Sequence, residues 1–151
     1  MANSTSLALS LANTRIADGL TAEQVDLLAG IAQLKGYEDG SVILGESDKS
    51  HDLLVLLTGS ADVRNVFDQE IGVVDAGSLI GELSFLDGKA RSAKVVSRGQ
   101  TECAVITRSA IQTLRTDHPE ILAIIMHNIA LGLAEKLRGA TRLVTALSAG
   151  F

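Results

Sequence analysis

The chain contains 151 residues, of which 46% are hydrophobic and 21% are charged, and its formal net charge at pH 7 is −5. This length suits one ordinary domain with a full hydrophobic core, and the composition excludes a mainly disordered chain. The acidic charge and the 3% share of aromatic residues disfavour nonspecific binding to a nucleic-acid backbone and stacking of single-stranded bases.

The N-terminal stretch MANSTSLALSLANTR does not have the pattern of a secretory signal peptide. No basic residue precedes its apolar part, and Ser and Asn interrupt that part. The most apolar later stretch, residues 121–134, is broken by His127 and Asn128 and is too short and too polar to span a bilayer. The sequence therefore predicts a soluble, cytoplasmic protein with residues 1–19 as an N-terminal segment and residues 20–151 as one domain that includes the C-terminal helix.

A helix is predicted from Ala22 to Leu34. Thr21 and Gln24 have the spacing of a capping box, and apolar residues follow at helical spacing. Gly36 is expected to end this helix.

Between Tyr37 and Ile106 the sequence favours short β-strands separated by turns such as Thr58–Ser60. Several short strands at this spacing indicate an antiparallel sandwich or jelly roll. The predicted strands are Ser41–Leu44, Leu53–Leu57, Ala61–Phe67, Ile71–Val74, Lys94–Ser97 and Cys103–Ile106.

After Thr107 the pattern is helical again. A short helix is predicted over Ser109–Arg115, and Pro119 opens a long apolar helix that reaches about Leu147, with a bend allowed near Gly139. Its first half is apolar nearly all round, which predicts burial on more than one side, against the sheet and optionally against a second chain. We therefore expect an α+β fold, an antiparallel β-roll flanked by an N-terminal helix and a long C-terminal helix.

The stretch from Gly77 to Ala93 reads GSLIGELSFLDGKARSA and interrupts the predicted sheet. A helix that begins after Gly81 would direct the backbone N–H groups of Leu83 and Ser84 toward an anion. Arg91 adds charge-assisted donors for a phosphate oxygen.

In this setting the stretch resembles the phosphate-binding cassette of the cyclic nucleotide-binding domain family, as found in catabolite activator proteins and protein kinase regulatory subunits. The matching residues are Gly77, Gly81-Glu82-Leu83-Ser84 and Arg91-Ser92-Ala93, and the resemblance runs from about Leu20 into the C-terminal helix. It implies that residues 20–151 form a domain for a 3′,5′-cyclic purine ribonucleotide, with the C-terminal helix as a lid. The implied ligand-binding residues are Gly81, Glu82, Leu83, Ser84, Arg91, Ser92 and Ala93.

Glu82 needs a separate role, because an ionised carboxylate is only an acceptor and repels phosphate. The ribose 2′-hydroxyl of a 3′,5′-cyclic nucleotide supplies a suitable donor beside the phosphate. By the same resemblance, Thr141 falls where a helix residue contacts adenine, and Arg138 lies within one turn of it. Ordinary solvated helix residues are an equal alternative for these two positions. The same resemblance implies that Ser92, in place of the Thr of many cyclic GMP binders of the family, favours cyclic AMP over cyclic GMP.

Enzyme signatures are absent from the sequence. His51, His118 and His127 are scattered and include no His-x-His, and we find no P-loop and no Ser nucleophile elbow. The lone Cys103 alternates with Val105 in a predicted strand and is expected to pack in the core. We therefore predict no catalytic residues, no enzyme activity and no metal.

Because the chain ends at Phe151, soon after the long helix, we expect no helix-turn-helix domain and no direct DNA binding. The prediction is a free-standing cyclic AMP sensor that signals to an unknown protein partner by movement of its C-terminal helix. It does not bind a membrane, and a homodimer is left open. The alternatives are a binder of cyclic GMP and a non-catalytic adaptor with the same fold.

Overall fold

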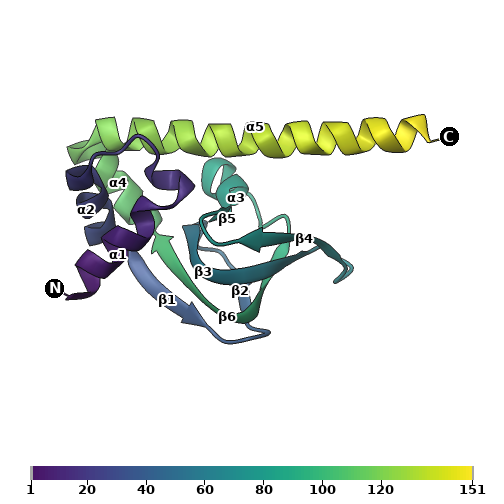
Figure 1. Ribbon diagram of the computed structural model, residues 1–151, viewed down its shortest axis with the longest axis horizontal. Coiled ribbons are helices and arrows are strands. Elements are labelled where there is room, and N and C mark those ends of the chain that lie inside the picture. Colours follow the sequence, from purple (N-terminus) through teal and green to yellow (C-terminus); the bar gives the residue numbers. More distant parts are fainter. Residues whose placement is uncertain (1, 151) are drawn as a thin grey trace.

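The computed structural model describes residues 2–150, which form a rolled antiparallel sheet with helices packed at one end and along one side (Figure 1). This arrangement confirms the predicted α+β fold. The helices are α1 (Ala2–Ala12), the 3₁₀ turn η1 (Arg15–Ala17), α2 (Ala22–Ile31), α3 (Glu82–Asp87), α4 (Arg108–Asp117) and α5 (Pro119–Ala149). The strands are β1 (Gln33–Tyr37), β2 (Val42–Leu44), β3 (Leu53–Arg64), β4 (Glu70–Asp75), β5 (Leu79–Ile80) and β6 (Lys94–Ile106).

The sheet is built on two long strands, β3 and β6, which pair with each other along most of their length. The order is β1-β6-β3-β4, with β2 paired to β6 and β5 paired to β3, and every pairing is antiparallel. Aliphatic side chains on the inner face of the roll form one core. Its buried members are Ile43, Leu44, Leu54, Leu56, Ala61, Ile80, Val95 and Cys103.

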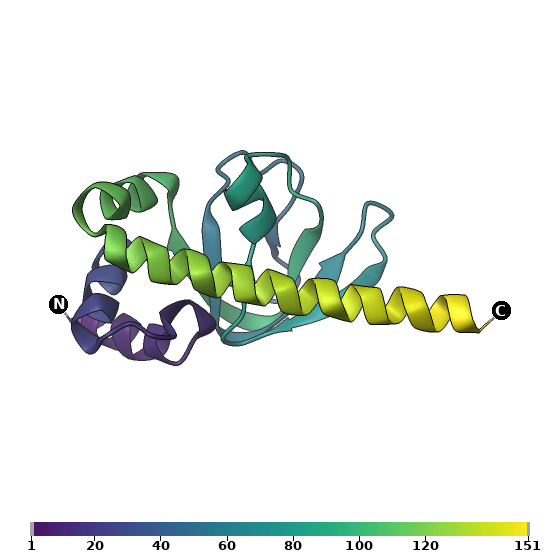
Figure 2. The same cartoon turned by 90° about the horizontal axis from the view of Figure 1, so that it is seen from above.

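A second core joins the helices to the sheet. Apolar side chains of α1, η1, α2, α4 and the first turns of α5 pack together against buried residues of β3 and β6. The buried Asn128 amide donates to the carbonyl oxygens of Ile16 and Asp18, both at 2.9 Å, and so fixes the first part of α5 to the N-terminal region. The second half of α5 projects past the sheet (Figures 1 and 2).

The first predicted helix is shorter than expected. The capping box of Thr21 and Gln24 is confirmed, but α2 ends at Ile31 and the backbone becomes extended at Ala32. The following residues form β1, which pairs with β6, so Gly36 lies in a strand and does not end the helix. Sheet pairing therefore overrides the helical spacing that includes Leu34.

The expected turn at Thr58–Ser60 is wrong, because β3 continues through it. Gly59 has φ +85°, and a Cβ there would lie 2.5 Å from the Gln100 carbonyl oxygen. The register with β6 shifts twice between Leu56 and Ser60, which marks a bulge between closely approaching strands. The last two predicted strands, Lys94–Ser97 and Cys103–Ile106, are likewise the two ends of β6.

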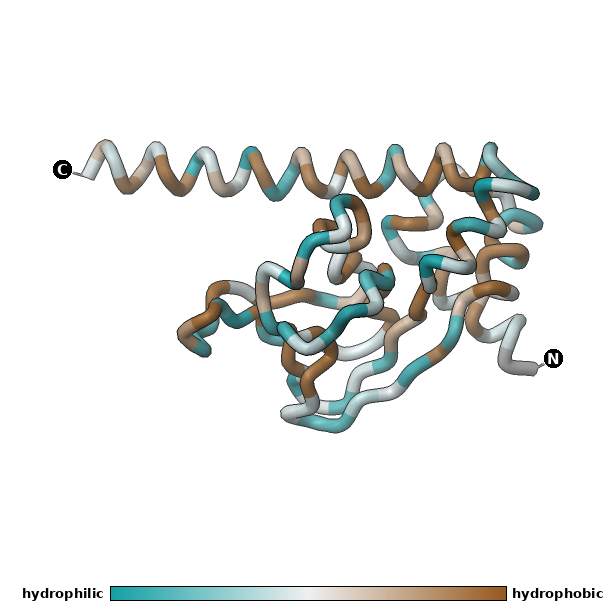
Figure 3. The backbone as a smooth tube through the Cα atoms, turned by 180° about the vertical axis from the view of Figure 1, so that it is seen from behind, coloured by the Kyte–Doolittle hydropathy of each residue, from teal (hydrophilic) through white to brown (hydrophobic). Residues whose placement is uncertain are grey.

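The C-terminal helices begin as predicted, with Pro119 at the first turn of α5. No bend occurs at Gly139, where α5 runs straight in both views (Figures 1 and 2). Burial within this chain is confined to one stripe in the first half of α5, formed by Ile121, Ile125, Asn128 and Ile129. Burial of a further side against a second chain stays a prediction. The exposed apolar residues of the projecting half include Leu137, Val144 and Leu147. Hydrophobic positions recur along this part of α5 as brown segments of the tube in Figure 3.

Candidate functional site

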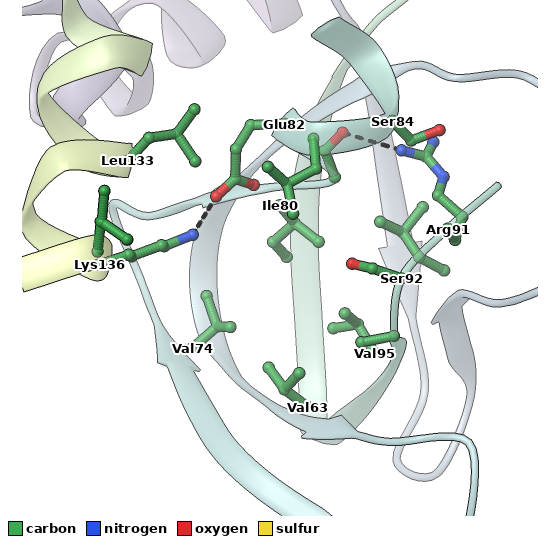
Figure 4. Close-up of a pocket in the computed structure, with 15 residues that line it drawn as sticks. Val63, Val74, Ile80, Glu82, Ser84, Arg91, Ser92, Val95, Leu133 and Lys136 are labelled. Atoms are coloured by element: carbon green, nitrogen blue, oxygen red, sulfur yellow. Dashed lines mark hydrogen bonds and ion pairs between the residues drawn. The ribbon is translucent and has the colours of Figure 1, made fainter. Parts of the chain in front are cut away.

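A cavity of about 500 Å³ opens between the inner face of the roll, α3 and α5 (Figure 4). This volume lies within the range of small-molecule sites. Charged and polar groups of the stretch after Gly81 surround one end, and aliphatic side chains line the rest. The aliphatic residues contributed by the roll are Leu44, Val63, Val74, Ile80 and Val95.

Gly81 forms the turn that leads into α3. Its backbone is left-handed, with φ +81°, which an L side chain rarely adopts. A Cβ there would lie 2.5 Å from Arg91 Nη1 and 2.9 Å from Leu44 Cδ1. The Arg91 side chain therefore takes the space that a Cβ at Gly81 would need.

The first turn of α3 leaves backbone donors free of helical partners. The first helical bond runs from Phe85 N–H to Gly81 O at 3.1 Å. The N–H groups of Leu83 and Ser84 precede it and have no acceptor one turn back in this helix. Leu83 and Ser84 both line the cavity, as the phosphate prediction requires.

The segment between β2 and β3 holds the Arg91 guanidinium in place beside the cavity. Its Nε and Nη2 donate to Asp48 Oδ2 at 3.2 and 3.0 Å, Nη2 also donates to Asp52 O at 2.9 Å, and Nη1 donates to Gly81 O at 3.0 Å. Within residues 2–150 these bonds use four of the five guanidinium N–H groups, so one Nη1–H remains for a ligand. The side chain is only 2% exposed.

Asp48, whose side chain is 25% exposed, completes this ion pair. Burial by itself raises the pKa of the Asp48 carboxyl, but hydrogen bonds from Ser50 and Arg91, with the Arg91 charge, hold that pKa below its usual value. Asp48 therefore stays ionised at neutral pH, and Arg91 keeps a fixed position beside the cavity.

Glu82 lies on the opposite side of the cavity end, where its side chain is 10% exposed. The Lys136 ammonium on α5 pairs with Glu82 Oε1, while the Lys136 side chain is 62% exposed (Figure 4). Glu82 and Arg91 thus do not pair with each other; each has its own partner. The acceptor at Glu82 and the donor at Arg91 remain available to separate parts of one ligand.

Ser92 and Ala93 also line the cavity. Figure 4 shows the Ser92 side chain directed into it, near Val95. The seven site residues predicted in and after the Gly81 turn therefore lie together around one cavity. Their chemistry suits an anion at the start of α3, a hydroxyl donor at Glu82 and an apolar ring against the strands.

The two base-contact candidates on α5 lie elsewhere in the structure. The α5 residues that line the cavity are Leu133, Lys136 and Leu137. Arg138 and Thr141 are exposed and line a separate shallow hollow, and Thr141 Oγ1 donates to Leu137 O at 2.9 Å. Their contact with a base stays a prediction.

The sequence did not single out Asp48, Asp52 or Lys136. Asp48 lies in a Gly-Glu-Ser-Asp stretch that has the composition of a turn, and a turn is all that this pattern indicates. Lys136 has the appearance of a solvated helix charge. Only the three-dimensional contacts with Arg91 and Glu82 identify these residues.

Other sequence candidates can be placed as well. Cys103 is fully buried on the inner face of the roll, and burial raises the pKa of its thiol to about 11. In the part of the chain that the structure describes, no three His, Cys, Asp or Glu side chains are grouped to hold a metal ion. No helix among residues 2–150 is long and apolar enough to cross a membrane.

Comparison with known proteins gives consistent matches. The cAMP-dependent protein kinase regulatory subunit of Pyricularia oryzae is 31% identical over 96 residues, covering 63% of this chain and 25% of that protein. The Cyclic AMP receptor protein of Thermus thermophilus is 29% identical over 126 residues, covering 81% of this chain and 56% of that protein. The chain thus spans about a quarter of the first relative and about half of the second.

A solved structure with the same architecture is the cyclic nucleotide-binding domain from Methylobacillus flagellatus. It superposes with a TM-score of 0.82 at 25% sequence identity, covering 95% of this chain and 83% of that one. The sequence profile described as "Cyclic nucleotide-binding domain" matches residues 34–118, which is more than half of the chain. The chain therefore belongs to the cyclic nucleotide-binding domain family.

Proposed function

We propose that this protein is a sensor that binds a 3′,5′-cyclic purine ribonucleotide, with cyclic AMP preferred over cyclic GMP, and that it has no catalytic activity of its own. The expected cytoplasmic location and the lack of direct DNA binding are part of the same proposal. The observation that carries it is the placement of two buried, separately held groups, Glu82 and Arg91, at one end of an apolar cavity.

In this proposal the phosphate lies against the start of α3. The N–H groups of Leu83 and Ser84, the Ser92 hydroxyl and the remaining Nη1–H of Arg91 act as its donors. The ribose 2′-hydroxyl donates to Glu82. The purine lies on the aliphatic wall, whose shape and dispersion contacts suit a flat ring without aromatic stacking.

Signalling would run through α5, because Glu82 contacts it directly. Lys136 already holds α5 beside the cavity, and Leu133 and Leu137 form part of the wall. Thr141 follows Leu137 by about one turn on the same side of the helix. A ligand that brings α5 closer to the cavity would draw Thr141, and Arg138 beside it, toward the base. A ligand can cause this closure only if it binds more tightly when α5 is closed than when it is open.

A thermal-shift screen tests this function directly. Cyclic AMP, cyclic GMP and 5′-AMP are each added at about 100 times a micromolar dissociation constant. A specific ligand at that excess stabilises the fold by about 2.7 kcal/mol, so cyclic AMP should raise the melting temperature by several degrees. A larger shift with cyclic GMP would reverse the base preference, and no shift with either cyclic nucleotide would contradict the proposal.

The projecting half of α5 favours a second candidate role, a homodimer that works as an adaptor. Small and aliphatic residues recur there at alternating spacings of three and four, the pattern of a two-stranded coiled coil. Val144 would occupy an a position of the heptad and Leu147 the following d position, a combination that favours a parallel two-stranded coiled coil. The residues of this seam in the projecting half are Ala140, Val144 and Leu147, and the same spacing continues back through Leu137, Leu133 and Ala130, of which Leu133 and Leu137 also line the cavity.

Sedimentation equilibrium of the wild type and of Val144→Glu tests the dimer. Because Val144 is 62% exposed in the single chain, its substitution should dissociate the dimer and leave the monomer folded. Thr145→Glu, next to it on the same helix, serves as a control off the seam. A wild type that sediments as a monomer at all concentrations would contradict the adaptor.

A further inference from the structure

The segment between β2 and β3, residues 45–52, contacts the phosphate-binding stretch at two separate places. One is the bond network of Asp48 and Asp52 with Arg91, described above. The other is His51, whose Nδ1 lies 2.6 Å from Ser84 Oγ in the first turn of α3. This second contact has no role in the function proposed so far.

The proton positions in this contact follow from its neighbours. Ser84 Oγ donates its single proton to Lys89 O at 2.6 Å, and a carbonyl oxygen can only accept. Ser84 Oγ is therefore an acceptor toward His51, and His51 Nδ1 must carry a hydrogen. The bonds run in one direction, from His51 through Ser84 to the backbone at Lys89.

This chain of bonds is well placed to set the geometry of the phosphate site. Ser84 is 3% exposed and supplies one of the proposed phosphate N–H donors. Lys89 lies two residues before Arg91, whose guanidinium returns to Asp52, the neighbour of His51. The two contacts thus close a ring that fixes the start of α3 and the Arg91 loop relative to each other.

The backbone of His51 adopts an uncommon conformation that allows both contacts. Its φ is +57°, in the left-handed region that non-glycine residues rarely occupy and that Asn, Asp and His tolerate best. This conformation lets the imidazole reach Ser84 while the next residue, Asp52, directs its carbonyl oxygen to Arg91.

We propose that His51 is a positioning residue for the phosphate contacts, acting through Ser84 and Lys89 and not by touching the ligand. This inference rests on the proposed function, since it concerns the affinity for a cyclic nucleotide. In this role His51 contributes one hydrogen-bond donor, its Nδ1–H. Without that donor, the start of α3 and the Arg91 loop would be free to move apart.

Two matched substitutions isolate that donor. His51→Asn keeps an amide N–H where Nδ1 lies and tolerates the left-handed backbone, whereas His51→Gln places its amide near the position of Nε2. By calorimetry, cyclic AMP should bind His51→Gln about three- to tenfold more weakly than wild type and His51→Asn within about twofold. His127→Gln, on an exposed face of α5, is the control and should not change the affinity.

A double-substitution cycle checks that the effect passes through Ser84. Ser84→Ala alone should weaken binding about three- to tenfold, and adding His51→Gln should weaken it by less than about twofold more, because coupled residues are not additive. Fully additive losses, or a His51→Gln variant that binds like wild type, would overturn the positioning role while leaving the proposed function intact.

The ring tautomer provides a readout that needs no ligand and no substitution. Nitrogen-15 spectra of the neutral imidazoles in the wild type should show His51 with its proton on Nδ1. A His51 ring protonated only on Nε2 would overturn the inference regardless of binding. A wild type with the Nδ1–H tautomer that binds no cyclic nucleotide would instead remove the proposed function, and with it any positioning role.

Discussion

The two sides of the cavity are built in opposite ways. On the side of α3 and Arg91, the Arg91 side chain is only 2% exposed and donates four hydrogen bonds, to Asp48, Asp52 and Gly81. On the side of α5, the contact consists of two leucines and one ion pair from Lys136, whose side chain is 62% exposed. Exposed ion pairs contribute about 0–1 kcal/mol, so α5 is the side that a ligand can move at low cost.

This difference suggests a division of labour between the two sides. A preorganised phosphate and ribose site provides affinity, because its groups need no reordering when the ligand arrives. A weakly held helix provides the response, because a modest difference in affinity is enough to shift its position. The following predictions test each side in turn, in order of decreasing expected effect.

The largest effect is expected from Arg91→Ala. Losing a buried charge-paired donor should weaken cyclic AMP binding by about 2–5 kcal/mol, or about 30- to several-thousand-fold. The protein should also lose stability, because Asp48 is left without its partner. Calorimetry measures the first effect and thermal unfolding the second.

A double variant separates these two effects. Arg91→Ala with Asp48→Asn removes the unpaired carboxylate and should regain stability without regaining affinity. Arg115→Ala, an exposed arginine on α4, is the matched control and should behave as wild type. If affinity returned together with stability, Arg91 would be a structural residue only.

Glu82→Ala is expected to give the next largest effect. A hydrogen bond to a charged acceptor contributes about 1.5–3 kcal/mol, so cyclic AMP should bind about ten- to a hundredfold more weakly. The same substitution should change the affinity for 2′-deoxy cyclic AMP much less, because that ligand has no hydroxyl to donate. Equal losses for both ligands would show that Glu82 does not contact the ribose, and Glu135→Ala on α5 controls for loss of a carboxylate.

The same contrast explains what the sequence could predict. The α3 side is encoded locally: Gly81, Glu82, Arg91 and Ser92 lie within a dozen positions, so their spacing can be recognised in the sequence. The long helix and the roll follow from periodicity. In contrast, the bulge at Gly59 resembles a turn, because both need the same residue type.

Contacts between distant segments could not be predicted in this way. Asp48 meets Arg91 across 43 positions, and Lys136 meets Glu82 across 54. No local pattern distinguishes these residues from other surface charges, because their partners are chosen by how the roll closes. The orientation of α5 also determines which of its residues face the cavity. Lys136 lines it, whereas Thr141, which the family resemblance indicated, lies at a separate hollow.

Thr141→Ala tests whether α5 closes when the ligand binds. In the present structure Thr141 is exposed and bonded only within its own helix, so the substitution should leave the unliganded protein as stable as wild type. If closure brings Thr141 to the base, cyclic AMP should bind about three- to tenfold more weakly. Thr145→Ala, one turn further along, is the control, and equal affinities for both variants and wild type would mean that α5 does not close.

Lys136→Gln should give the smallest effect, and it tests how much the ion pair between Lys136 and Glu82 contributes to ligand affinity. The substitution leaves Glu82 without its cation beside a site that receives an anionic ligand, so cyclic AMP should bind about two- to threefold more weakly at low salt. The difference should shrink as salt approaches about 1 M, where charges separated by more than about 3 Å are screened. Arg115→Gln controls for the loss of one positive charge. A gain in affinity would instead mean that Lys136 competes with the ribose hydroxyl for Glu82. In that case the ligand would release α5 from the cavity, the opposite of the closure proposed above.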